Sequence, residues 1–298
     1  MEENTIINDD SIKYLLKTKK KDLTIDLPFI DPPFNQGKDY QFHDDDIPEE
    51  RYWGLMKRVC KLIYNRTSDG GSIYFMQREK NTRHVMEVLE DTGWTYQNLI
   101  IWKKKTSAVP QNYKSGLHYQ IIVFATKGDK PRVFNKLRIN PPRLVTEKYD
   151  RPNGMYVTDV WDDIRELTSG YFAGDEALRL ENGERFHKQQ SPIALLLRII
   201  LSSSNIADLI FDPFARTGTT LVVAKQLSRR YIGIEIDPKN FEEIKKRLIN
   251  LRESDNIEKY RKDYIFTENL NEIWPSKNAQ IYNPFSFEKL ISDKAASN

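Results

Sequence analysis

Short apolar runs that suit strands alternate with segments of helical spacing along most of this chain. The expected strands are residues 23–30, 72–76, 96–102, 119–125, 207–211 and 231–236. The expected helices are residues 49–65, 82–92, 193–201, 219–229 and 238–252, the third of them capped by Ser191 with Pro192 in its first turn. Strands alternating with helices indicate an α/β fold, whose mostly parallel sheet is covered by helices on both faces.

Composition excludes several classes of protein. The chain has 298 residues, which suits one large α/β domain with an insertion, or two modest domains. Its single cysteine excludes an internal disulfide and a zinc site built on thiolates, and its four histidines lack metal-ligand spacing. We therefore expect no metal. The polar N-terminus is unlike a signal peptide, and no apolar run reaches the roughly 18 residues of a membrane span, so we expect a soluble intracellular protein.

The middle of the chain differs from the rest. Residues 127–185 contain four prolines, many charges and weak periodicity, which favours an insertion or small subdomain beside the sheet. Residues 127–151 carry eight basic and three acidic side chains, although the net charge of the whole chain is only +3. A basic run is usually a solvated face, so this one favours a nucleic-acid partner without establishing it.

The tetrapeptide Asp31-Pro32-Pro33-Phe34 follows a buried strand. Two prolines cannot continue a central strand, so they fix a turn that holds the Asp31 carboxylate, the Pro32 carbonyl and the Phe34 ring at the sheet edge. A carboxylate and a carbonyl can accept both N–H bonds of an aromatic amine and free its lone pair, and a ring can stack on a base. Taken alone, such a tetrapeptide is fairly often only a loop break followed by a core phenylalanine.

A second strand end, residues 212–220, feeds the N-terminus of a helix, where backbone N–H groups are unpaired. Gly218 would let a ligand approach the backbone, and Glu235 closes the next strand about twenty residues on, where an acid commonly binds ribose hydroxyls. These features suit a nucleoside-bearing cofactor, although a plain turn and a surface acid suit them equally. The dinucleotide pattern Gly-x-Gly-x-x-Gly is absent at this turn.

The two strand ends and their order resemble the beta-class amino-methyltransferases of DNA, which occur in bacterial restriction–modification systems. In that class the catalytic motif comes first, a target-recognition region follows, and the cofactor motif comes last. The resemblance covers residues 6–251 and rests on 8–11, 31–34, 71–74, 98–103, 118–128, 159–161, 187–192, 212–220 and 229–235. It implies a Rossmann-like fold that binds S-adenosylmethionine, with a small target-recognition insertion.

The resemblance also implies domains and site residues. Residues 1–128 would form the catalytic half, 129–185 the target-recognition region, 186–254 the cofactor half and 255–298 a C-terminal tail on the surface. The implied catalytic residues are Asp31, Pro32, Pro33 and Phe34. The expected cofactor-binding residues are Asp10, Ser11, Asp31, His187, Gln189, Gln190, Asp212, Pro213, Phe214, Ala215, Thr217, Gly218, Thr219, Thr220, Glu235 and Ile236. Lys136, Arg138 and Arg143 are expected to contact DNA phosphates.

The implied reaction is methyl transfer from S-adenosylmethionine to the N6 amine of a flipped-out adenine, since aspartate at the first tetrapeptide position favours adenine in that class. Cytosine N4 is the alternative. The sequence also leaves open an RNA or protein-amide methyltransferase, a catalytically silent DNA-binding subunit and a Rossmann-type dehydrogenase. Double-stranded DNA in the bacterial cytoplasm or nucleoid is the expected partner, and a homodimer and a cognate restriction endonuclease stay open.

Arg216 and Thr217 stand where the class usually has Gly and Ser, and Lys188, Gln189 and Ser191 also depart from its pattern. If position 216 has a positive φ, the arginine is strained by roughly 1–3 kcal/mol.

Overall fold

A computed structural model gives the fold of the chain. It describes residues 4–35, 39–40, 43–44, 46–106, 108–110, 112–140, 151–167, 174–187 and 189–275.

An eight-stranded sheet forms the centre of the molecule, in the order β1-β12-β11-β2-β5-β7-β6-β10. Its strands are β1 (Thr5–Asn8), β2 (Leu27–Ile30), β5 (Ser72–Arg78), β6 (Thr95–Lys103), β7 (Tyr119–Thr126), β10 (Val160–Trp161), β11 (Leu209–Asp212) and β12 (Arg230–Glu235). Only β7 runs antiparallel to its two neighbours in this sheet. The predicted mostly parallel sheet is therefore confirmed.

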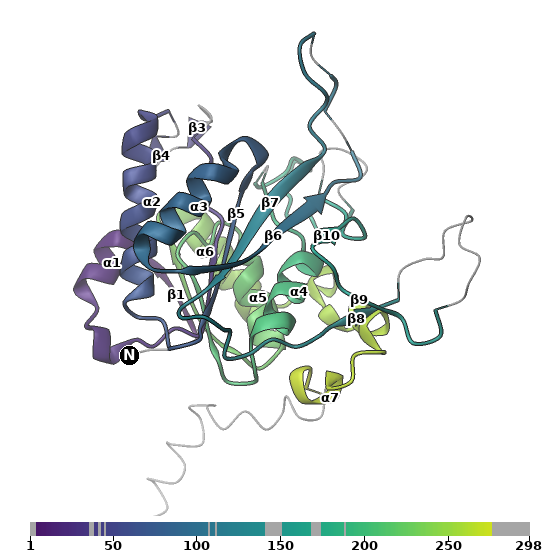
Figure 1. The fold of residues 1–298 in the computed structure, drawn as a ribbon. Helices are drawn as coiled ribbons and strands as arrows, with labels where there is room; N and C mark the ends of the chain where they lie inside the picture. The colour runs from purple at the N-terminus through teal and green to yellow at the C-terminus, as the bar shows by residue number, and fades with distance from the viewer. Residues whose placement is uncertain are drawn as a thin grey trace, which may run out of the picture.

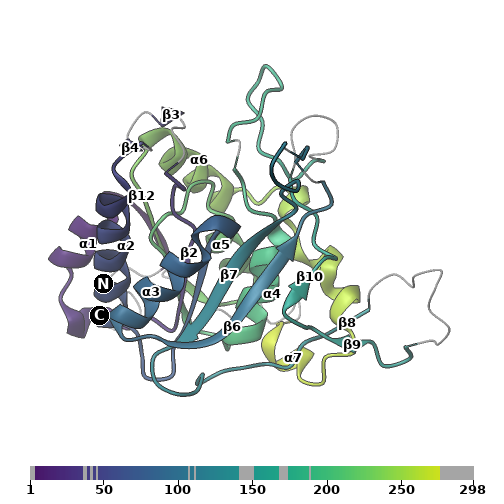
Figure 2. The ribbon, with the colours of Figure 1, turned by 45° about the horizontal axis from the view of Figure 1, so that its top comes forward.

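Helices cover both faces of the sheet (Figures 1 and 2). On one face, α1 (Ser11–Lys17), α2 (Glu49–Tyr64) and α3 (Thr82–Thr92) share an apolar cluster with the sheet. On the other, α4 (Ile193–Ser203), α5 (Thr219–Gln226) and α6 (Pro238–Ile249) join a second cluster. Each face of the sheet thus has its own core, as expected for an α/β fold.

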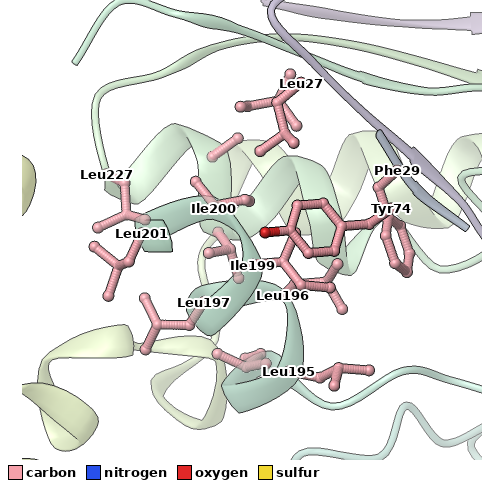
Figure 3. Close-up of a cluster of buried hydrophobic side chains, with 14 of the residues drawn as sticks. Leu27, Phe29, Tyr74, Leu195, Leu196, Leu197, Ile199, Ile200, Leu201 and Leu227 are labelled. Carbon is pink, nitrogen blue, oxygen red and sulfur yellow. The ribbon is translucent and has the colours of Figure 1, made fainter. Parts of the chain in front are cut away.

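The helix α4 is mostly apolar and almost fully buried, because it lies between the sheet and the C-terminal segment. Figure 3 shows its leucines and isoleucines packed with side chains of β2 and with Leu227. Tyr74 of β5 points its ring toward this helix, and its hydroxyl lies 2.7 Å from Oγ of Ser203. Burial of such a continuous apolar surface holds α4, and the loop before it, firmly against the sheet.

The start of α4 corrects one prediction. The helix begins at Ile193 after Pro192, and Ser191 does not cap it. The Ser191 hydroxyl donates instead to Oδ2 of Asp31, 3.1 Å away. A serine before a helix is free to bond elsewhere when a nearby carboxylate competes for its hydroxyl.

The segment after α6 also differs from the prediction of a surface tail. It contains η4 (Glu253–Asp255), η5 (Ile257–Tyr264) and α7 (Leu270–Ile273), and its Trp274 is completely buried. Asp255 is buried between the guanidinium groups of Arg247 and Arg252, at 2.7 and 2.6 Å. The polar composition misled the prediction because the charges neutralise one another while the apolar side chains enter the core of α4.

The remaining elements are short. They are η1 (Lys20–Asp22), η2 (Glu79–Asn81) and two small antiparallel pairs, β3 (Asp39–Tyr40) with β4 (His43–Asp44) and β8 (Arg138–Ile139) with β9 (Met155–Tyr156). The β8–β9 pair lies beside the C-terminal segment, away from α1 to α3 (Figure 2).

The strands β2 and β11 are parallel neighbours at the centre of the sheet. From β2 the next sheet neighbour is β5 on one side, and from β11 it is β12 on the other. The sheet neighbours of β2 and β11 thus lie in opposite directions, which makes the ends of these two strands a topological switch point. Open α/β sheets bind ligands at such a point.

Candidate active site

Two buried aspartates mark the switch point. Asp31 directly follows β2 and Asp212 ends β11, and both side chains are almost inaccessible to solvent. The sequence placed both at strand ends, and the parallel pairing of the two strands brings these ends to the same edge.

Hydrogen bonds hold the turn that carries Asp31. The Tyr52 hydroxyl of α2 donates to the Pro33 carbonyl at 2.8 Å and accepts from Nε2 of Gln77 at 3.0 Å. Beyond the turn, the Asn35 amide donates to and accepts from the backbone of Ile47. With two proline rings fixing φ, the turn is rigid.

The guanidinium of Arg216 lies on this turn. Its Nη1 donates to Oδ2 of Asp31 at 3.1 Å, and its Nη2 donates to the Pro32 carbonyl. The guanidinium carbon is 5.5 Å from the centroid of the Phe34 ring, within range of a cation–π contact. Three of the four tetrapeptide residues therefore contact the side chain of Arg216, which follows the other strand end. The spacing of the motifs in the sequence could not predict these contacts.

The backbone of Arg216 is left-handed, with φ of +49°. A non-glycine residue in this region is strained, so the surroundings must hold it. The Arg216 N–H donates to Oε2 of Glu235 at 2.7 Å, and the neighbouring Ala215 N–H donates to the Ile234 carbonyl. Gly218, with φ of +73°, has no room for a side chain, because a Cβ there would lie 2.7 Å from Ile244.

A first pocket lies beside this loop, where β11 and β12 end. Its empty space is about 810 Å³, which includes the solvent at its open mouth. Its lining residues are Asp10, Ser11, Pro33, Tyr52, Leu55, Met56, His187, Pro213, Phe214, Arg216, Ile234, Glu235, Ile236, Asp237 and Asn240. Apolar walls next to several carboxylates suit a ligand with an aromatic ring and hydroxyl groups.

Glu235 is the most enclosed acid of the first pocket. It accepts hydrogen bonds from the backbone of Arg216 and Asp237, and more weakly from Asn240 at 3.4 Å. Burial raises the pKa of its carboxyl group above the usual value, although these N–H donors oppose the change. A carboxylate offers about four acceptor positions, so Glu235 keeps capacity for a ligand hydroxyl.

The N-terminal segment reaches the same pocket. Asp10 caps α1 by accepting from the Lys13 N–H at 2.9 Å, and the Ser11 hydroxyl donates to the Pro213 carbonyl. His187 also lines this pocket, and its Nδ1 accepts a hydrogen bond from the Gln189 N–H. The predicted cofactor-binding residues that line the first pocket are Asp10, Ser11, His187, Pro213, Phe214, Glu235 and Ile236.

The other predicted cofactor residues lie deeper or to the side. Asp31, Gln189, Asp212, Ala215, Thr217, Thr219 and Thr220 line a small cavity behind the loop. Gln190 lines a wider pocket and also holds the segment before it, because it accepts from the Leu178 N–H and donates to the Glu176 carbonyl. Gly218 shapes the loop and lines none of these spaces.

A second, wider pocket opens on the other side of Arg216. Its walls include Asp31, Phe34, Met76, Trp102, Lys104, Thr106, Gln120, Glu166, Arg179, Arg185, Ser191 and Arg216. Glu166 fixes one wall by accepting the N–H groups of Lys105 and Thr106 at 2.8 and 2.9 Å. Asp31 and Phe34 of the tetrapeptide line this pocket, and Arg216 lines both this pocket and the first one.

Sequence reasoning missed several of these pocket residues. Tyr52, Leu55 and Met56 belong to α2, whose helical spacing indicated only core packing. Trp102 and Gln120 belong to central strands, where alternate side chains point to opposite faces. The sequence held no specific signal for either set.

Asp212 is a buried site carboxylate whose pKa is raised well above its usual value. Burial, aided by the nearby charge of Asp31, raises its pKa to about 7. Its Oδ1 accepts the Phe214 N–H at 3.0 Å, which fixes the first residues of the loop.

The residues predicted to contact phosphates lie apart from both pockets. Lys136 is exposed, and Arg138 is part of β8, where it donates to the Asn153 carbonyl and stacks 4.3 Å over the Tyr156 ring. Arg143 lies outside the described residues. In the part of the chain that the structure describes, no cluster of three metal-binding side chains occurs, and no helix could cross a bilayer.

Comparison with known proteins gives the relatives of this chain. Residues 25–246 match the DNA methylase family of N6/N4 type. The type II methyltransferase M.HpaI of Haemophilus parainfluenzae is 30% identical over 247 residues, which cover 83% of this chain and 74% of that protein. The DNA adenine methyltransferase YhdJ of Escherichia coli (strain K12) is also 30% identical, over 79% of each chain.

A solved structure supports the fold. The complex of M1.HpyAVI with SAM superimposes with a TM-score of 0.56 at 22% sequence identity, and the match covers 83% of this chain and 99% of that one. The Rossmann-like fold expected from the sequence is thereby confirmed.

Proposed function

Because this chain belongs to the N6/N4 DNA methylase family, we propose that it transfers a methyl group from S-adenosylmethionine to the N6 amine of a flipped-out adenine in double-stranded DNA. The family membership rests on a match to 25–246 and on the relatives above. The base, the cofactor contacts and the roles of individual residues are the parts that we propose.

One observation carries the catalytic assignment. A single planar, nitrogen-bearing group, the Arg216 guanidinium, spans the Asp31 carboxylate and the Pro32 carbonyl while facing the Phe34 ring. An exocyclic amine on an aromatic base needs the same three contacts: two acceptors for its N–H bonds and a ring against its face. The turn is therefore built to bind this class of group.

The chemistry follows from the acceptors. The lone pair of an aromatic amine is delocalised into the ring, so the nitrogen is a weak nucleophile. Hydrogen bonds to Asp31 and Pro32 favour a tetrahedral nitrogen, and the carboxylate stabilises the positive charge that develops on it. Stacking on Phe34 contributes roughly 1–3 kcal/mol and holds the base in line for transfer.

The first pocket is the proposed site of S-adenosylmethionine. When bound, the cofactor supplies an electrophilic methyl group on its sulfonium. Glu235 would accept hydrogen bonds from the ribose hydroxyls, and the apolar side chains Phe214 and Ile236 would enclose the adenine ring. Pro33 lines this pocket, so the cofactor would lie next to the catalytic turn. Asp10 and Ser11 would complete it from the N-terminal segment.

The second pocket is the proposed site of the target base. A base within a duplex cannot reach Asp31, so it must leave the helix, and a wide pocket with Phe34 and Trp102 in its walls can receive it. Lys104, Arg179 and Arg185 line the same pocket and would attract the phosphates of the flipped nucleotide. We assign residues 129–185 to target recognition, and this region includes Arg179 and Arg185.

Adenine is favoured over cytosine by the aspartate at the first tetrapeptide position and by the relative YhdJ, a DNA adenine methyltransferase. The test is incubation of the protein with labelled S-adenosylmethionine and unmethylated DNA, followed by digestion to nucleosides. Label in N6-methyldeoxyadenosine is expected. Label in N4-methyldeoxycytidine would overturn the base, and an absence of label on every DNA tried would overturn the activity.

The contact between Arg216 and Asp31 also favours a second candidate, a methyltransferase fold that binds DNA without catalysis, because the acceptors are occupied. Calorimetry with S-adenosylmethionine separates the two. Stoichiometric binding is expected for the enzyme, whereas a silent subunit with a blocked pocket gives no heat.

A further inference from the structure

We infer that Arg216 occupies the place of the target amine in the free protein, so that the base and this guanidinium compete for the same two acceptors. This inference rests on the proposed function, because Asp31 and Pro32 are the acceptors assigned there to the amine. It adds a residue that determines how readily a base enters the site.

The competition follows from the contacts. Arg216 uses Nη1 for Asp31, and for the Gln189 carbonyl at 3.4 Å, and uses Nη2 for the Pro32 carbonyl. Only about a tenth of its side chain is exposed, at 11%, and the Asp31 side chain is less exposed still, at 5%. An amine placed on these acceptors would overlap the guanidinium, so the two cannot be bound together.

Charge leads to the same conclusion. Methyl transfer places a positive charge on the amine nitrogen, and the adjacent Asp31 carboxylate would stabilise it. A guanidinium held 3.1 Å from that carboxylate already neutralises it and would repel the new cation. Transfer therefore requires the guanidinium to leave the turn.

The structure allows the side chain to move while its backbone stays. The Arg216 N–H is bonded to Glu235, and the next carbonyl in the chain, that of Thr217, accepts from Arg247 at 2.7 Å. The side chain beyond Cβ has several rotatable bonds and borders both pockets, so a rotamer change suffices. The backbone at residues 216 and 217 can therefore stay in place while the Arg216 guanidinium moves.

The consequence is a lower apparent affinity for the target. Only the fraction of molecules with the guanidinium displaced can accept the base, and the apparent dissociation constant rises by the inverse of that fraction. If about one molecule in ten is open, removal of the guanidinium strengthens target binding about tenfold.

The experiment compares Arg216→Gly, Arg216→Lys and the wild type. Glycine matches the positive φ and removes the cation. Lysine keeps the charge and the strain, but its single nitrogen lacks the planar fork that spans both acceptors. Arg83→Met, which removes an exposed arginine on α3, is the control. Circular dichroism confirms that each variant is folded, and the lysine variant provides the comparison if the glycine variant is not.

The first measurement is the KM for unmethylated DNA with labelled S-adenosylmethionine. Arg216→Gly is expected to lower KM about tenfold without lowering kcat, with Arg216→Lys in between and Arg83→Met unchanged. An unchanged KM in both Arg216 variants overturns the inference. Loss of S-adenosylmethionine binding by calorimetry in the glycine variant also overturns it, since Arg216 would then be a cofactor-binding residue.

The second measurement needs no activity. It is the affinity for adenosine, which carries its exocyclic amine on C6, measured by calorimetry on protein whose first pocket is saturated with S-adenosylhomocysteine. Tighter binding to Arg216→Gly than to the wild type supports the competition even if no DNA is methylated, in which case the proposed function alone fails. Equal affinity, together with methylation by the wild type, rejects the competition and leaves the proposed function intact.

Discussion

The hydroxyl of Ser191 donates a hydrogen bond to Oδ2 of Asp31 across 3.1 Å, joining the start of α4 to the end of β2. The same oxygen accepts from Arg216, so Ser191 orients the carboxylate whether or not the guanidinium is in place. We propose a positioning role for this serine, which also lies in the wall of the second pocket.

We expect Ser191→Ala to lower kcat about tenfold while the affinity for S-adenosylmethionine stays unchanged, because a lost orienting hydrogen bond contributes about 1–1.5 kcal/mol. The measurement is steady-state label transfer alongside calorimetry. Ser191→Thr retains the hydroxyl and should recover most of the rate. Equal rates for alanine and wild type would show that the turn alone orients Asp31.

Asp31→Ala is expected to reduce single-turnover methyl transfer by at least about a hundredfold, because the variant loses the group that stabilises the developing charge. Binding of S-adenosylmethionine should survive, since Asp31 does not line the first pocket. Asp91→Ala, which removes an exposed partner of Lys57, is the matched control. Comparable turnover by Asp31→Ala would remove this residue from catalysis.

Much of the fold was predictable, because residues 72–76, 82–92 and 119–125 carry clear periodicity and lie within observed elements of the same kind. The strand β1 and the helix α1 were not predicted, because both elements are short and polar residues lie next to them. β1 is an edge strand stabilised by pairing with β12, a tertiary contact that local pattern cannot report.

The site was predictable only in part. Motif order placed Asp31 and Asp212 at strand ends, and the structure brings these ends together. Sequence spacing carries no information on the direction of side chains. The hydrogen bonds that Arg216 and Ser191 donate to Asp31 could therefore not be predicted. The strain on Arg216 depended on whether this position has a positive φ, and the structure has a φ of +49° there.

Asp212→Asn should make stability less dependent on pH. The folded protein holds the pKa of Asp212 at about 7, above the usual 3.8, so it binds this proton more tightly than the unfolded chain does. That contribution is complete below pH 3.8 and is lost as pH rises toward 7. The upper limit of the loss is on the order of 4 kcal/mol. The amide keeps an acceptor for the Phe214 N–H.

Thermal unfolding at pH 5 and pH 8 checks this expectation. Asp212→Asn should gain stability relative to the wild type at pH 8 and gain clearly less at pH 5. A constant difference at the two pH values would contradict the proton linkage.

Lys136→Ala is expected to weaken DNA binding equally across sequences and to reduce the slope of log K against log salt by about 1, if Lys136 contacts a phosphate. Fluorescence anisotropy at several salt concentrations measures both. Lys57→Ala, on α2 at the other face of the sheet, is the control. A change confined to one DNA sequence would make Lys136 a base reader.

Trp274→Ala should destabilise the protein by about 3–5 kcal/mol, because the ring is completely buried against the core of α4. Chemical denaturation measures the loss. A small effect would mean that the C-terminal segment contributes little to the core.

The pairing of β1 with β12 has a consequence for the order in which the protein assembles on the ribosome. Asn8 of β1 bonds to the carbonyl of Glu235, which lies 227 residues later. Asp31 likewise meets a guanidinium 185 residues away. In the nascent N-terminal half, β1 and the edge of β2 that does not pair with β5 therefore lack partners until β11 and β12 have been synthesised. Such long-range closure slows folding and exposes strand edges to aggregation, so synthesis of this chain should depend on chaperones more than synthesis of a locally connected helical protein of equal length.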